Sequence, residues 1–66
     1  MWLVYYTPVG NSALHFDMAF SDYEMLASAR KHLLSSTTNL HHVMGRAGQT
    51  MTAEHVAVLF AGEANA

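Results

Sequence analysis

The chain contains no cysteine, which excludes disulfide bonds and metal sites built on thiolates. Only 12% of its residues are charged, whereas 52% are hydrophobic, so intrinsic disorder is not expected. With 66 residues, the chain is near the lower limit for a domain that folds without disulfide bonds or a bound metal. We therefore expect one small domain over residues 1–66, with a core formed by packing alone or completed by a partner. The scarcity of charge favours the partner.

Basic residues are scarce as well. The chain has three basic and five acidic residues, and its formal net charge is −2. A nucleic-acid-binding protein needs a basic face to neutralise phosphates, so direct nucleic-acid binding is not expected. The apolar runs are too short to span a bilayer, and no secretory leader pattern opens the chain. These absences predict a soluble, cytoplasmic protein of a bacterial or host cell that does not contact membranes.

Catalytic and cofactor-binding motifs are missing too. The sequence has no nucleophile elbow, no glycine-rich phosphate loop and no H-E-x-x-H motif, so we expect neither an enzyme nor a cofactor. Five histidines are present, but none are four residues apart, the helical spacing for a shared metal ion. Adjacent side chains are expected to point in different directions, so we predict no metal site, with a His-based metal-binding module as an alternative. The histidines are His15, His32, His41, His42 and His55.

The clearest pattern that is present is a helix start at Ser21. The Ser21 hydroxyl can cap free backbone N–H groups, and Glu24 stands at the position from which a capping box reaches back. Phe20 and Met25 have the spacing of a hydrophobic staple. This pattern divides the chain into a strand-like part before it and a helix-like part after it.

The residues before Ser21 predict a β-hairpin. Residues 2–6 are aromatic or β-branched, and residues 7–12 are rich in turn formers. Residues 13–20 then alternate between large apolar and small or polar side chains, which is typical of a half-buried strand. We expect Phe16 and Met18 on its buried side and His15 and Asp17 facing water.

The residues after Ser21 predict a helix that begins at Asp22. Met25, Leu26, Ala29 and Leu33 fall on one helical stripe, which we expect to be its buried face. The run of Ser, Thr and Asn over residues 35–39 should then end the helix, because these side chains compete for backbone hydrogen bonds.

Residues 40–62 allow two interpretations. Apolar residues from 40 to 47 have helical spacing, with Gly48 placed to end a short helix. Thr52 could cap a second short helix over residues 53–61, with Gly62 as its stop, although Val56–Phe60 would also suit a buried strand. We therefore expect an α+β fold made of an N-terminal hairpin, one capped helix and two short helices. The alternative is a ββαββ fold with a C-terminal hairpin, and in both cases the tail frays from about residue 63.

The first strand has apolar side chains on both faces. Trp2, Val4 and Tyr6 lie on one face and Leu3 and Tyr5 on the other. A hairpin covered by helices has only one inner face, so one set must lie outward unless the last segment or another chain covers it. Trp and Tyr are enriched at binding hot spots. We predict partner binding through Trp2, Tyr5, Tyr6, Asp22, Tyr23 and Glu24.

These observations together favour a non-enzymatic protein-binding module. A short chain that begins at Met and carries no motif or targeting signal is typical of small phage and mobile-element proteins. In size and build it is similar to anti-CRISPR inhibitors, a resemblance that implies occupation of a surface on a bacterial effector complex. A homodimer is a second expectation. Clustering of the acids Asp17, Asp22, Glu24 and Glu54 into a phosphate-mimicking face is left open.

The rival class is a small DNA-binding regulator. Residues 40–59 resemble a helix-turn-helix through Arg46-Ala47-Gly48 and the apolar stretch that follows. Gln49 and Glu54, however, stand where that motif usually has apolar residues. Its second helix would carry no Lys or Arg for phosphates or guanine edges.

Overall fold

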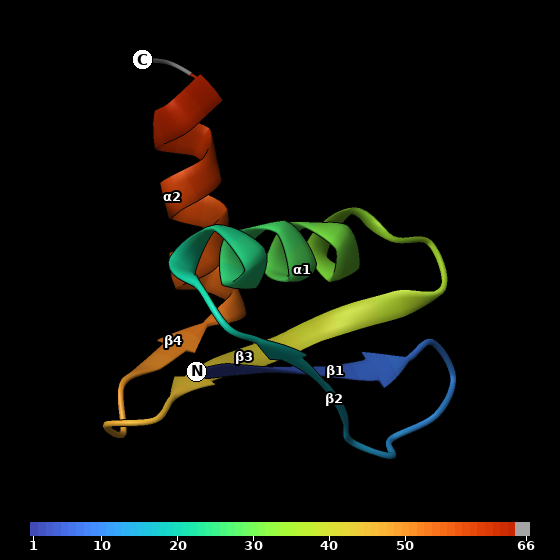
Figure 1. The fold of residues 1–66 in the computed structure, drawn as a ribbon. Coiled ribbons are helices and arrows are strands. Elements are labelled where there is room, and N and C mark those ends of the chain that lie inside the picture. The colour runs from blue at the N-terminus through green and yellow to red at the C-terminus, as the bar shows by residue number, and fades with distance from the viewer. Residues whose placement is uncertain (65–66) are drawn as a thin grey trace.

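Two β-hairpins, each followed by a helix, make up the chain in a computed structural model that describes residues 1–64 (Figure 1). The expected α+β class is confirmed. The elements are β1 (Trp2–Pro8), β2 (His15–Ala19), α1 (Asp22–Leu34), β3 (Thr38–Gly45), β4 (Thr50–Thr52) and α2 (Ala53–Ala64).

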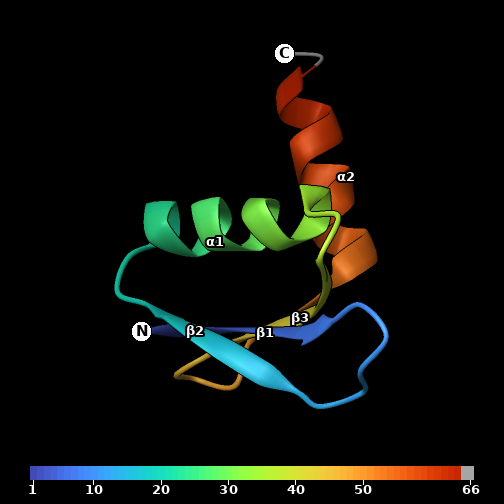
Figure 2. The ribbon, with the colours of Figure 1, turned by 90° about the vertical axis from the view of Figure 1, so that its right-hand side faces the viewer.

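The four strands form one antiparallel sheet in the order β2-β1-β3-β4. Strands β2 and β3 both run antiparallel to β1, so they are parallel to each other, and α1 connects them across β1. Both helices lie on the same side of the sheet, and α2 extends away from it (Figures 1 and 2). No element of residues 1–64 covers the other side of the sheet (Figure 2).

The core lies between the sheet and the helices. It is small, and small side chains in it let α1 approach the strands closely. Its buried members are Val4, Ala19, Met25, Ala29, Leu40, Val43 and Val56.

Helix α1 begins and ends where the sequence predicts. The backbone N–H of Glu24 donates to Ser21 Oγ at 3.1 Å, so Ser21 is the N-cap, and the helix ends before Ser35. Met25 and Ala29 are buried as expected, while Leu26 is partly buried. The sequence analysis missed His32, which is also buried on this face, with 5% of its surface exposed.

The expected orientation of β2 is wrong. Ala19 is buried and Asp17 faces the helices, whereas Phe16 and Met18 are each 53% exposed on the opposite side of the sheet. The predicted alternation is present, but its larger apolar side chains lie on the side away from the core. The polar partners of Asp17 explain the inverted orientation.

A small polar network joins β2, α1 and β3 at Asp17. His32 Nε2 lies 2.7 Å from Asp17 Oδ2, and the Ser28 hydroxyl donates to the same oxygen at 3.2 Å. The other ring nitrogen of His32, Nδ1, lies 2.9 Å from Thr38 Oγ1. No buried side-chain nitrogen or oxygen within the described residues lacks a hydrogen-bond partner. The network can therefore be buried without the cost of unpaired polar groups.

The first of the two short C-terminal helices is not formed. Its residues lie in β3, where a β-bulge opposite the Tyr5–Tyr6 step inserts His41 as an extra residue. The bulge puts Leu40 and Val43 on the same face of the strand, three positions apart, which imitates helical spacing. Residues 40–59 thus hold two strands and part of α2, and not a helix-turn-helix.

The second short helix is confirmed as α2. Thr52 Oγ1 accepts from the backbone N–H of His55 at 3.1 Å, the expected cap. Val56–Phe60 is helical, so the alternative strand there is wrong, although a C-terminal hairpin does exist as β3–β4. Gly62 does not stop the helix, and Gly48 lies in the β3–β4 turn with a φ of 88°. Of the expected frayed tail, residues 63–64 belong to α2 and residues 65–66 lie outside the described part.

The Ser21 cap gives a direct stability prediction. Ser21→Ala should lower the free energy of unfolding by about 1 kcal/mol, because the Glu24 N–H loses its acceptor at the start of α1. Urea denaturation would measure the loss. Ser36→Ala is the matched control, because Ser36 is exposed and forms none of the side-chain hydrogen bonds found in residues 1–64. Equal stability of the two variants would contradict the cap.

Asp17 gives a prediction for acid stability. Burial raises the pKa of Asp17. The hydrogen bond from His32 and the charge of Lys31 lower it by more than burial raises it, so the pKa of Asp17 is below its ordinary value. The carboxylate therefore stabilises the fold above the unfolded pKa of about 3.9, and this contribution disappears as the pH falls through the folded pKa. Asp17→Asn should lower the free energy of unfolding by about 1 kcal/mol at pH 7.

At pH 2.5, the difference between wild type and Asp17→Asn should shrink. Urea denaturation at the two pH values measures this change. Glu54→Gln, which removes an exposed carboxylate from the first turn of α2, is the control. A difference that stays constant from pH 7 to pH 2.5 would show that the Asp17 charge does not stabilise the fold.

Candidate protein-binding surface

The side of the sheet opposite the helices carries six side chains that we call the open face. The register places Leu3 between Met18 and Met44, and Tyr5 between Phe16 and His42. These residues alternate with those that face the helices, so strand periodicity puts all six on one side. The open face consists of Leu3, Tyr5, Phe16, Met18, His42 and Met44.

The rings of the open face contact one another across three strands. The ring of Tyr5 stacks on His42, with centroids 4.6 Å apart and planes 13° from parallel. On its other side, Phe16 lies at 5.8 Å in a tilted arrangement. Cross-strand aromatic pairs of this kind stabilise a sheet and hold the rings in place. The surface is therefore formed in the isolated chain.

Much of the open face is exposed to solvent. Phe16 and Met18 are 53% exposed and Met44 is 38% exposed. On β4 the two rows continue with Thr52 opposite His42 and Thr50 opposite Met44. A contiguous exposed apolar patch is the usual mark of an interaction site on a small protein.

Two histidines meet at the edge of this surface. The sequence predicted that His41 and His42 point apart, but the bulge brings their Nδ1 atoms to 2.7 Å, so that expectation is wrong. Burial lowers the pKa of His42, and the nearby His41 lowers it further. His42 is therefore neutral at pH 7, and the open face carries no formal charge.

The structure distributes the six predicted partner-binding residues over separate places. Tyr5 alone lies on the open face. Trp2 is on the helix side, where its Nε1 donates to Asp22 Oδ1 at 2.9 Å. Tyr6 is also on the helix side and stacks on His32 with ring centroids 3.8 Å apart. Trp2 and Tyr6 therefore support the core side of the sheet.

The remaining predicted residues lie at the start of α1. Tyr23 is 83% exposed, and the backbone N–H of Glu24 donates to the N-cap residue Ser21. Asp17 is engaged with His32 on the helix side of the sheet, so it does not join Asp22 and Glu24 in a four-acid face. The sequence analysis missed Phe16, Met18, His42 and Met44 as surface residues. Leu3 and Tyr5, which share one face of β1, could have located them. The residues paired with these two on the neighbouring strands lie on the same side of the sheet.

Among residues 1–64, no group of three or more His, Cys, Asp or Glu side chains is arranged to hold a metal ion. The His41–His42 pair supplies two ring nitrogens, whereas zinc usually takes four ligands. Within the same residues, neither helix is long and apolar enough to cross a bilayer. No family model, curated protein or solved structure matches the chain.

Proposed function

We propose that the protein is a non-enzymatic protein-binding module that acts by covering a surface of its partner with the open face. One observation carries this proposal: a sheet side with six uncharged side chains remains uncovered by residues 1–64. The exposed side of an antiparallel sheet is ordinarily polar. Here both sides are apolar, and covering the second one would remove apolar surface from water.

The chemistry of the open face supports a protein partner. It has no Lys or Arg to pair with phosphates, so a nucleic acid is a poor fit, whereas an apolar protein surface is a good one. The inhibitor role expected from the sequence, occupation of a bacterial effector complex in the cytoplasm, is one form of this proposal, with the open face as the contact surface in place of the predicted residues, of which it keeps only Tyr5. A homodimer with the two sheets packed face to face is the other form.

Charge introduced on the open face should weaken binding and leave the fold intact. Phe16→Glu and Met18→Glu each place a carboxylate in an apolar contact, and both residues are exposed enough for the core to remain undisturbed. We expect a loss of at least about tenfold in affinity, typical of a hot-spot residue. Binding to proteins captured from the host and sedimentation of the pure protein measure the two forms of the proposal.

Val9→Glu is the matched control for these variants. Val9 is 57% exposed in the β1–β2 loop, so it undergoes the same change of charge outside the open face. Circular dichroism should show unchanged folding in all three variants. If the Phe16 and Met18 variants keep both their partner and their oligomeric state while remaining folded, the open face is not the contact surface.

The DNA-binding alternative predicts a different result. The three basic residues are Arg30, Lys31 and Arg46, so at most about three phosphates could be neutralised. Lys31 Nζ also lies 3.7 Å from the carboxylate of Asp17. We therefore expect weak DNA binding with a shallow salt dependence in fluorescence anisotropy titrations. Submicromolar, steeply salt-dependent binding by the purified protein would instead support a regulator.

A further inference from the structure

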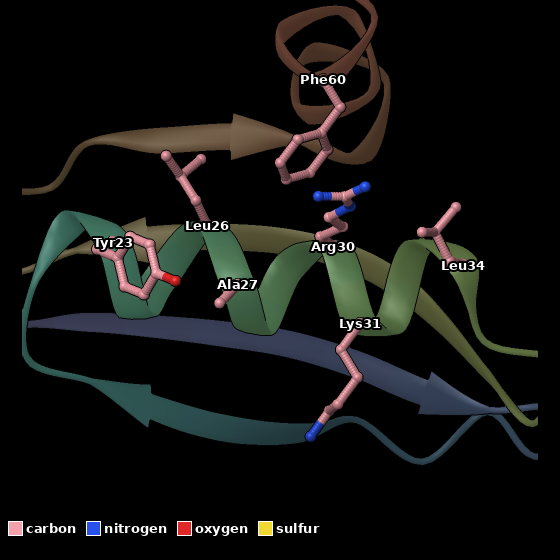
Figure 3. A pocket seen from close by; sticks show the side chains of 7 residues that line it. All are labelled: Tyr23, Leu26, Ala27, Arg30, Lys31, Leu34 and Phe60. Atoms are coloured by element: carbon pink, nitrogen blue, oxygen red, sulfur yellow. The ribbon is translucent and has the colours of Figure 1, made fainter. Parts of the chain in front are cut away.

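A second surface lies between α1 and α2, on the side of the molecule away from the open face. It is a groove of about 430 Å³ with mostly apolar and aromatic lining (Figure 3). Tyr23 and Leu34 stand toward its two ends on α1, and Phe60 of α2 forms one wall (Figure 3). Tyr23 is 83% and Leu34 is 72% exposed, so the isolated chain leaves much of the groove open.

The groove also presents the positive charge of Arg30. Arg30 and Lys31 line it and no acidic side chain does, but Lys31 Nζ lies 3.7 Å from Asp17 Oδ2. The guanidinium carbon of Arg30 lies 5.7 Å from the centroid of the Phe60 ring (Figure 3). Arg30 forms no ion pair with a carboxylate of the described residues. A guanidinium held over an aromatic ring keeps donors free for a carboxylate.

The shape of the groove favours an elongated occupant. Residues 23–34 of α1 span about 16 Å, or roughly three helical turns. A site for a small molecule normally encloses most of its ligand, whereas this groove is open along the helix. An amphipathic helix laid into an apolar groove has the matching length and shape.

We propose that this groove binds an acidic amphipathic helix of a partner protein. Apolar side chains on one face of that helix pack along Leu26, Leu34 and Phe60, and an Asp or Glu carboxylate accepts hydrogen bonds from Arg30. This site goes beyond the open face and does not depend on it, because the two surfaces lie on opposite sides of the sheet.

The probe is a synthetic helical peptide of about four turns, with Leu at positions i, i+3, i+4 and i+7 and Glu beside this stripe. A second peptide carries Lys in place of every Glu. Amide chemical shifts of the full ¹⁵N-labelled protein would be followed during titration with each peptide. We expect the acidic peptide to shift amides of α1 and those around Phe60, and the basic peptide to leave them unchanged.

Substitutions at Arg30 identify the anchor. Arg30→Glu should weaken binding of the acidic peptide at least tenfold, and Arg30→Lys should weaken it less because the charge is kept. Arg46→Glu, which makes the same charge change in the exposed β3–β4 turn, is the control and should leave the affinity unchanged. Phe16→Glu should leave it unchanged as well, which separates this site from the open face.

Three results of the peptide titrations would overturn the proposal. They are no shift with the acidic peptide, equal affinity for both peptides, and equal weakening by Arg30→Glu and Arg46→Glu. Groove amides that shift with protein concentration alone would also overturn it, because a second copy of the chain would then be the occupant.

Discussion

Asp17 lies on the helix side of β2, where it pairs with His32, and the strand alternation then fixes the side on which each of the other β2 residues lies. Because side chains alternate along a strand, an inward Asp17 forces Phe16 and Met18 outward. The pairing with β1 and β3 then extends this outward side to Tyr5, His42 and Met44. The apolar surface is therefore the reverse side of strands whose inward residues include the polar Asp17.

The chain has many apolar residues but a small core. Ala19 and Ala29 bring α1 close to the sheet, while several of the larger apolar side chains remain outside. Two separate surfaces result, a neutral one on the sheet and a positively charged groove beside α1. Under the two proposals above, these surfaces take different partners, because one is neutral and the other carries the charge of Arg30.

The sequence predicts those elements whose boundaries are encoded by local hydrogen bonds. Ser21 and Thr52 cap their helices as expected, and the first hairpin follows from its turn residues. The sequence does not predict β3, because the bulge at His41 changes the apolar spacing from two to three. It also does not predict the open face, because that depends on Asp17 and His32 pairing across 15 positions of the chain. Hydrophobicity alone assigns Phe16 and Met18 to the core.

The methionine methyl groups allow the most direct test of this account. In ¹³C-methyl spectra of the free protein with a soluble paramagnetic agent, the account predicts strong broadening of Met18 and Met44 and protection of Met25, which is 4% exposed. When a bound partner or second copy covers the open face, Met18 and Met44 should become protected together. Met18 as protected as Met25 in the free monomer, or methyls of Met18 and Met44 that stay broadened in the complex, would contradict it.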